Sequence, residues 1–188
     1  MHIKRFVENV PQQYLNNMIQ KEALFTKEEC LKLKEFFIEK QANVIIPKGQ
    51  TRVNYKGYLL EDNQEGRELF QKLFDWFEQE TNIKIHNLPR ENYFMKYDVG
   101  DVFHQHTDTA RDRIWIIGVQ LSDEDEYEGA DFIFYENNEK HLINKKIGSA
   151  FITKADVSHE VTRLNKGQRY SFVSFPDMNS LRSSKSLL

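Results

Sequence analysis

Apolar residues in the first part of the chain recur at helical spacing. Leu33, Phe36 and Phe37 lie three and four positions apart, so a helix places them on one face. Thr26 and Glu29 precede them at the spacing of a capping box, in which two side chains close the first turn of a helix. We therefore expect a helix that begins near Thr26.

A second helix is expected from about Glu65 to Thr81. Its apolar stripe is broad and consists of Leu69, Phe70, Leu73, Phe74 and Phe77. The segment between the two helices, "TRVNYKGYLL", is rich in β-branched and aromatic residues and is typical of an extended chain. The first part of the chain is thus predicted to be mainly helical.

After Asn87 the apolar pattern changes to a period of two. Five segments have the pattern of short strands separated by Gly, Asp and Asn turns: "NYFMKY", "RIWIIGVQL", "ADFIFY", "SAFIT" and "QRYSFVSF". Many short strands without intervening helices favour a sandwich or barrel over a parallel sheet. The predicted fold class is α+β and mainly β: a double-stranded β-helix, or jelly-roll core, with the N-terminal helices packed outside.

The length of 188 residues suits one domain with a substantial core. We expect a helical part over about 1–88, a jelly-roll core over about 89–176 and a short tail at 177–188. The segment near Leu88 and Pro89, where the pattern changes, is neither long nor flexible in composition. It is therefore interpreted as the boundary between two parts of one domain and not as a linker between domains.

Charge and cysteine content narrow the class of protein. A formal net charge of -3 argues against a nucleic-acid partner or an anionic membrane surface. The single cysteine, Cys30, cannot form an intramolecular disulfide. The longest apolar run, "IWIIGV", is far shorter than a membrane span. We therefore expect a cytoplasmic protein. The sequence does not indicate its oligomeric state.

The segment "HQHTD" holds the first candidate ligands for a metal ion. In an extended chain, residues two apart point the same way, so His106 and Asp108 share a direction, as do His104 and His106. Candidates for a third ligand are His2, His86, His141 and His159. His159 is favoured because it begins a predicted strand shortly before a turn and a further strand.

That further strand carries a candidate anion receptor. Arg169 and Ser171 lie on one face of it, and a buried arginine is costly without an anionic partner. Two histidines and one carboxylate leave half of an octahedral metal open, as in the facial triad of non-haem Fe(II) oxygenases. A carboxylate receptor beside such a metal suits 2-oxoglutarate, whose keto-acid end chelates iron. Pairing of Arg169 with an internal acid remains the alternative.

At these residues the chain resembles the Fe(II)/2-oxoglutarate-dependent dioxygenases, specifically the prolyl 4-hydroxylase-like branch. The pattern Tyr-x-x-Gly-x-x-(Tyr/Phe)-x-x-His-x-Asp is matched in register by Tyr97, Gly100, Phe103, His106 and Asp108. "YEGADFIFY" is similar to the family's Tyr-x-Gly-Gly segment but has Ala130 for the second Gly and Asp131 for Glu. "HEVTRLNKGQRYSF" is similar to its His-x-Val and Gly-x-Arg. The likeness runs from about Leu24 to Pro176.

The resemblance implies roles for six residues. His106, Asp108 and His159 become iron ligands, and Arg169 binds the distal carboxylate of 2-oxoglutarate. Tyr97 donates its hydroxyl to the same carboxylate, with Ser171 as a weaker third contact. The alternatives are a core tyrosine at Tyr97 and an ordinary strand residue at Ser171.

The activity implied is hydroxylation of a C–H bond with release of succinate and CO2, using O2, with ascorbate as an optional reductant. A prolyl residue in a peptide or protein is the first expectation for the substrate, and a free amino acid or other small molecule the second. A nucleic-acid demethylase is disfavoured because no further arginine follows Arg169 in "YSFVSFP". A non-catalytic jelly-roll binding module and a cupin-like metalloenzyme without 2-oxoglutarate remain open.

Residues at the substrate entrance are not fixed by this pattern. Candidates from two segments are Arg52, Tyr55, Tyr58, Arg111, Arg113 and Trp115.

Overall fold

The computed structural model describes residues 18–39, 56–59 and 64–181, without the side chains of 56–59, 64–67 and 69. The helices are α2 (Lys27–Glu39) and α3 (Gln64–Thr81). The strands are β1 (Met18–Lys21), β2 (Lys56–Leu59), β3 (Asn92–Tyr97), β4 (Phe103–His106), β5 (Trp115–Gln120), β6 (Tyr127–Gly129), β7 (Phe132–Glu136), β8 (Glu139–Leu142), β9 (Ala150–Lys154), β10 (Ser158–Val161), β11 (Leu164–Gly167) and β12 (Arg169–Ser174). Arg52 and Tyr55 lie outside the described residues, and only the backbone of Tyr58 is described.

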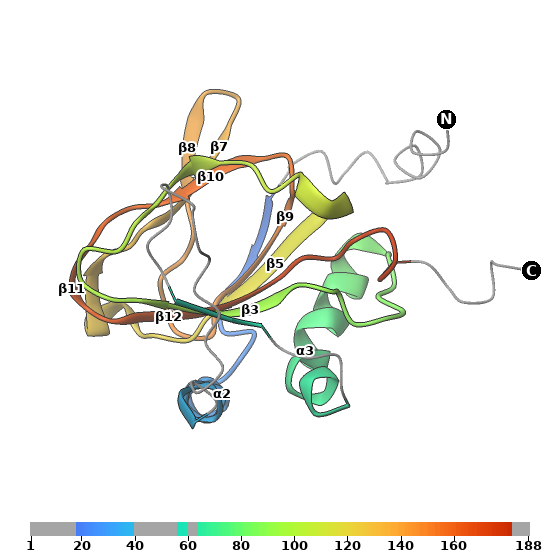
Figure 1. Ribbon diagram of the computed structural model, residues 1–188, viewed down its shortest axis with the longest axis horizontal. Coiled ribbons are helices and arrows are strands. Elements are labelled where there is room, and N and C mark those ends of the chain that lie inside the picture. The colour runs from blue at the N-terminus through green and yellow to red at the C-terminus, as the bar shows by residue number, and fades with distance from the viewer. Residues whose placement is uncertain (1–17, 40–55, 60–63, 182–188) are drawn as a thin grey trace, which may run out of the picture.

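Two antiparallel sheets form the body of the protein (Figure 1). The larger has six strands in the order β1-β9-β5-β12-β3-β2, and the smaller has four in the order β4-β10-β7-β8. A two-stranded ribbon, β11 with β6, extends from one end. Both α2 and α3 cover the face of the larger sheet that is turned away from the smaller one (Figure 1). The predicted mainly β jelly-roll fold with helices packed outside is confirmed.

Helix α2 begins as its sequence predicts. The backbone N–H of Thr26 donates to the Glu29 carboxylate at 2.7 Å, and the backbone N–H of Glu29 donates to the Thr26 hydroxyl at 3.2 Å. This reciprocal capping box satisfies two amide groups that lack partners within the helix. The buried face of α2 includes Phe37, whose ring stacks on Phe94 of β3 at 4.3 Å between centroids.

Successive side chains of β12 point alternately to the two faces of the larger sheet. Tyr170 and Phe172 point to the helices, where Phe172 stacks on Phe70 of α3 at 3.5 Å between ring centroids. Arg169, Ser171 and Val173 are buried on the opposite side, which faces the smaller sheet. The strand therefore sends Arg169 and Ser171 toward the space between the sheets and Tyr170 and Phe172 toward the helix layer.

The expected helical part and the expected tail contain ordered elements that the prediction did not include. The N-terminal part contributes two strands, β1 and β2, to the edges of the larger sheet, and only the second falls within the segment predicted as extended. The tail expected from residue 177 is packed over its first residues, since Asp177, Ser180 and Leu181 are buried. Neither helix of the described residues is both long and apolar enough to span a bilayer.

A substitution at Gly148 tests how much the close contact between the chain before α2 and the chain before β9 contributes to stability. Its φ is +81°, and an added Cβ would lie 1.9 Å from the Phe25 carbonyl oxygen, so Gly148→Ala requires a backbone shift. We expect the free energy of unfolding to fall by roughly 2–4 kcal/mol, measured as a lower urea midpoint with an unchanged m-value.

Gly100→Ala is the matched control for this substitution. Gly100 also has a positive φ, +95°, but the nearest atom to an added Cβ is 4.0 Å away. It should lose only the backbone strain, about 1 kcal/mol. Equal losses for the two variants would mean that the contact with Phe25 is unimportant.

Candidate metal centre

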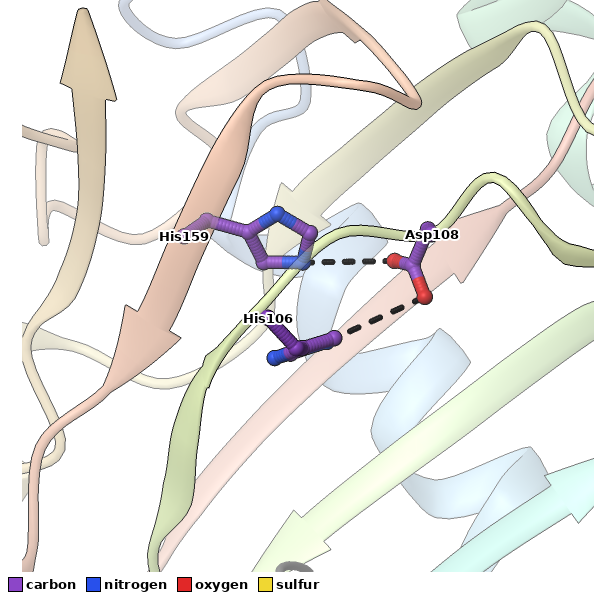
Figure 2. A group of neighbouring side chains, drawn as sticks. All are labelled: His106, Asp108 and His159. Carbon is purple, nitrogen blue, oxygen red and sulfur yellow. Dashed lines mark ion pairs between the residues drawn. The ribbon is translucent and has the colours of Figure 1, made fainter.

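Three side chains from two segments converge between the sheets (Figure 2). His106 ends β4, Asp108 follows it in the next loop, and His159 lies opposite His106 in the β4–β10 pair. The Nε2 atom of His159 is 3.2 Å from one Asp108 carboxylate oxygen, and the Nε2 atom of His106 is 3.8 Å from the other. One ligand atom of each residue lies within 4.8 Å of the others. We call these residues the metal triad.

Each histidine is oriented by its own backbone. The Nδ1 atom of His106 lies 2.7 Å from the carbonyl oxygen of His104, and that of His159 lies 2.9 Å from the carbonyl oxygen of Val157. Because a carbonyl oxygen only accepts hydrogen bonds, each Nδ1 carries the hydrogen and each neutral ring keeps its Nε2 lone pair for a ligand. This is the tautomer that metal-binding histidines need.

The Nε2 atom of His106 is buried and has no hydrogen-bond partner in the described part of the chain. A buried polar atom without a partner is costly. Two imidazole nitrogens and one carboxylate oxygen are also the donor set of a facial triad on a first-row divalent metal. The residues therefore fit a metal ion such as Fe(II).

Aromatic rings support the two imidazoles. Phe103 stacks on His106 with 3.8 Å between centroids, while Phe132 and Phe134 lie 5.6 Å and 5.2 Å from the ring of His159. These rings restrict rotation of the ligands and lower the local dielectric constant. Packing therefore helps to hold both imidazoles in place.

The protonation states of His106 and Asp108 at neutral pH also suit metal binding. Burial, followed by the nearby His159, lowers the pKa of His106 below its ordinary value. Burial raises the pKa of Asp108, but the nearby His159, with His106 and Arg113, outweighs it, so the pKa ends below the ordinary value. A neutral imidazole thus faces a carboxylate.

The lowered pKa of His106 predicts a loss of stability of the metal-free protein in mild acid. The unfolded chain takes up this proton near pH 6.5, whereas the folded chain takes it up only at lower pH. Stability is therefore full above about pH 6.5 and falls as the pH drops from there toward the folded pKa. Urea midpoints between pH 7.5 and 5 measure the slope, which His106→Gln should reduce; an unchanged slope in that variant contradicts the assignment.

A buried arginine lies on the same inner side of the larger sheet. Arg169 is 2% exposed and donates through Nη2 to the side-chain oxygen of Gln120 at 2.9 Å. Its Nε atom is buried without a hydrogen-bond partner, and no carboxylate of the described residues forms an ion pair with it. The alternative of an internal acid as its partner therefore has no support in this part of the chain.

The other predicted cosubstrate residues surround Arg169. Its guanidinium lies 5.4 Å from the ring centroid of Tyr97, which is its register partner on β3. Ser171, two residues along β12, is paired with Gln120 of β5 and is also buried. Residues opposite each other in an antiparallel pair point to the same face. Arg169, Tyr97, Ser171 and Gln120 thus share one surface.

Phe132 connects this surface to the metal triad. Its ring centroid is 5.9 Å from the Arg169 guanidinium carbon and 5.6 Å from the His159 ring centroid. Arg169 and the metal triad therefore both lie against the same buried ring between the sheets. Gln120 was not expected at this place; its only signal in the sequence is a polar residue at the end of the apolar run "IWIIGVQ".

The remaining candidates lie elsewhere. His104 is exposed and contributes only its carbonyl oxygen, while His86 and His141 lie outside the metal triad, which is the single group of metal-ligand side chains found in the described residues. Trp115, considered for the substrate entrance, instead packs against Phe77 of α3 at 5.6 Å between ring centroids. It faces the helix layer, away from the site. His2 lies outside the described residues.

Ala130 retains the backbone shape that its position demands. Gly129 has φ +81° and Ala130 has φ +46°, so the alanine adopts the left-handed conformation that glycine accepts more readily. The substitution of Ala for the second Gly therefore does not straighten the loop that leads into β7.

Arg113 also contacts the triad, donating from Nη1 to Asp108 at 3.0 Å while its Nε donates to Glu91 at 2.6 Å. Arg111 is largely exposed, with 75% of its side chain accessible, and contacts Glu91 as well. No feature of the sequence marks Glu91 as part of the site.

Comparison with protein-family models and with curated protein sequences finds no match. Solved structures do match. A prolyl hydroxylase from Trichoplax adhaerens, in complex with a hypoxia inducible factor oxygen degradation domain peptide, is 15% identical, with 94% of this chain and 91% of that chain covered and a TM-score of 0.68. A viral collagen prolyl hydroxylase from Paramecium bursaria Chlorella virus-1, in a 2OG complex, is 17% identical, with 85% and 94% covered and a TM-score of 0.66.

A 2OG-Fe(II) oxygenase family oxidoreductase from Burkholderia pseudomallei is 14% identical, with 87% of this chain and 86% of that chain covered and a TM-score of 0.65. Each likeness extends over most of both chains. The chain therefore has the fold shared by prolyl hydroxylases and other 2OG-Fe(II) oxygenases.

Proposed function

We propose that the protein is an Fe(II)- and 2-oxoglutarate-dependent dioxygenase that hydroxylates a C–H bond. His106, Asp108 and His159 would hold the iron, His106 and His159 through Nε2 and Asp108 through a carboxylate oxygen. The overall reaction balances as substrate C–H plus 2-oxoglutarate plus O2 giving substrate C–OH, succinate and CO2. Bound iron and cosubstrate supply the oxygen chemistry, while the protein binds and orients the reactants.

The observation that carries this proposal is a buried cation that has no anionic partner among the described residues and lies against the same ring as an open metal triad. A charged guanidinium in such surroundings is costly unless an anion enters. Phe132 contacts both Arg169 and His159, so a short molecule could reach both. 2-Oxoglutarate carries a carboxylate at each end and meets both requirements.

The distal carboxylate of the cosubstrate would bind at Arg169. Charge-assisted hydrogen bonds from a guanidinium are strong and directional, and the Nε atom of Arg169 is available for one. The hydroxyl of Tyr97 and that of Ser171 are proposed as further donors, since both residues lie on the same surface as Arg169. Gln120 already fixes one guanidinium nitrogen and so orients the group.

A prolyl residue in a peptide or protein is the substrate that we propose first. Support comes from the fold likeness to prolyl hydroxylases, one of which was solved with a peptide bound. A free amino acid or another small molecule is the second candidate. Comparing extracts of cells with and without the enzyme for proteins that gain one oxygen atom on proline would distinguish the two.

Cosubstrate turnover tests the activity itself. Purified protein supplied with Fe(II), 2-oxoglutarate, O2 and ascorbate should release succinate slowly even without substrate. 2-Oxoglutarate with a redox-inert divalent metal should raise the midpoint of thermal unfolding. Absence of both effects would favour a non-catalytic binding module. Metal binding without any response to 2-oxoglutarate would favour the cupin-like alternative.

A further inference from the structure

An ion-pair chain leads from the metal triad to the start of β3. Arg113 lies at its centre, with Nη1 donating to Oδ1 of Asp108 at 3.0 Å and Nε donating to Oε2 of Glu91 at 2.6 Å. All three side chains are largely buried, with 13% of Asp108, 14% of Arg113 and 10% of Glu91 exposed. Groups buried to this extent interact more strongly than surface ion pairs.

Arg113 is fixed from several sides. Its guanidinium carbon lies 4.1 Å from the ring centroid of Phe175, and Glu91 holds it by the ion pair. Glu91 is itself held by the hydroxyl of Tyr93 at 2.8 Å and by Arg111 at 2.6 Å. A guanidinium clamped in this way has little freedom to leave Asp108.

This contact makes the two oxygens of Asp108 unequal. Oδ1 accepts a hydrogen bond from Arg113 and lies 3.8 Å from the Nε2 atom of His106, whereas Oδ2 lies closer to the triad, 3.2 Å from the Nε2 atom of His159. A carboxylate that binds a metal through one oxygen uses one coordination position, and one that binds through both uses two. Occupying Oδ1 favours binding through a single oxygen and so leaves three positions of an octahedral ion open.

The charge of Arg113 would ordinarily oppose a cation at this site. Glu91 partly offsets that charge at 2.6 Å, so Arg113 presents less positive charge to the metal than an isolated arginine would. The arginine can then orient Asp108 by a directed hydrogen bond without the full repulsion of an isolated cation.

The backbone of the loop between Asp108 and Arg113 supports a functional role for their contact. Arg111 and Asp112 both have φ +58°, a left-handed conformation that costs free energy in residues with a side chain. This geometry lies between Asp108 and Arg113, five residues apart in the sequence, whose side chains meet. Strain of this kind persists where the surrounding contacts require it.

We propose that Arg113 and Glu91 are positioning residues for the metal: Arg113 holds Asp108 in single-oxygen geometry, and Glu91 holds and neutralises Arg113. The inference rests on the proposed function, because it assumes that the triad binds a divalent ion. The competing explanation is that the pair only fastens the loop to β3.

Metal affinity separates these explanations. Calorimetric titration of the metal-free protein with Mn(II) should show about 10- to 100-fold weaker binding for Arg113→Met, as expected when an outer partner of a metal ligand is removed. Arg111→Met is the matched control. It removes a 2.6 Å contact to the same Glu91 but does not touch Asp108. Its Mn(II) affinity should stay within about twofold of the wild type, since exposed ion pairs contribute little.

The single substitution removes the buried partner of Glu91 and leaves that carboxylate with the exposed Arg111 and the Tyr93 hydroxyl, so it can reduce folding as well as binding. The double variant Glu91→Gln/Arg113→Met removes both charges and keeps the fold, which circular dichroism verifies. It should still bind Mn(II) about 10-fold or more weakly. Arg113→Lys should recover little affinity, because one ammonium group cannot reproduce a rigid fork between two acids.

Wild-type Mn(II) affinity in the folded double variant would overturn the proposal and leave the pair a structural fastener. Failure of the wild-type protein itself to bind Mn(II) would instead reject the proposed function. Arg169→Met serves as an internal standard, because it should lose 2-oxoglutarate binding without a loss of Mn(II) affinity. The two failures are therefore distinguishable.

Discussion

Asp108→Ala is expected to lose succinate release by a factor on the order of a thousand or more, because the metal loses its only anionic protein ligand. The two remaining ligands are neutral imidazoles, and Arg113 then faces the ion with one acid fewer. Metal affinity should fall first, since divalent cations bind poorly to two imidazoles beside a positive charge. Metal content after dialysis and succinate release under saturating 2-oxoglutarate measure the two effects.

Asp156→Ala is the matched control. Asp156 is an exposed carboxylate in the turn just before β10, only three residues from His159. Its removal changes the net charge by the same amount without touching the triad, so metal content and turnover should stay near the wild type. Retention of iron and of succinate release by Asp108→Ala would show that the metal triad has been assigned wrongly.

Arg169→Met should separate cosubstrate binding from metal binding. Loss of one partner of a buried charge pair costs about 2–5 kcal/mol, which corresponds to roughly 30- to several-thousandfold weaker 2-oxoglutarate binding. Steady-state kinetics should show this as a raised KM for 2-oxoglutarate, while Mn(II) affinity is retained. Methionine fills much of the same volume, so the fold is kept.

Stability gives this variant a second signature. In the metal-free protein Arg169 is 2% exposed and its Nε has no hydrogen-bond partner among the described residues. Replacing such a charge by an apolar side chain should leave the midpoint of thermal unfolding unchanged or higher. The further rise on adding 2-oxoglutarate should disappear.

Arg163→Met is the control for loss of an arginine near the same strand, because the side chain of Arg163 is exposed and donates, among the described residues, to the Gly100 carbonyl oxygen. It should retain both the KM and the response to 2-oxoglutarate. An unchanged KM in Arg169→Met would place the cosubstrate carboxylate elsewhere and remove the main support for the proposed function.

Much of the fold follows from local patterns. The Thr26–Glu29 capping box is readable because both partners lie within one turn, and the structure forms both of its hydrogen bonds. The period-two segments became β3, β5, β7, β9 and β12 because alternation fixes which face of a strand is buried. Strands β1, β6 and β11 were not predicted, since each is short and depends on a partner for its definition.

The candidate site likewise contains residues that local patterns predict and residues that they do not. His106 and Asp108 are two residues apart, so extended chain alone sends them in one direction. His159 was selected by its context and by the family resemblance, and the pairing of β4 with β10 places it opposite His106. Gln120 and Glu91 carry no such local signal.

Ion pairs illustrate why the remaining part needed the tertiary structure. The chain has 29 acidic and 26 basic residues, so a particular pair cannot be selected from the sequence. Arg113 was considered for the substrate entrance, yet it is largely buried between Asp108 and Glu91. Trp115, two residues later, turns to the helix layer instead.

By itself, the sequence determined the jelly-roll class, the His-x-Asp element and the inward side of Arg169, because helix and strand periodicity are properties of neighbouring residues. Only the tertiary structure decided that Arg169 is paired with an amide and with no acid of the described residues. It also decided that Asp108 has one oxygen held by Arg113 and the other facing His159. These contacts join residues far apart in the chain, or turned together by a folded loop, so they depend on strand pairing and burial that no local pattern encodes.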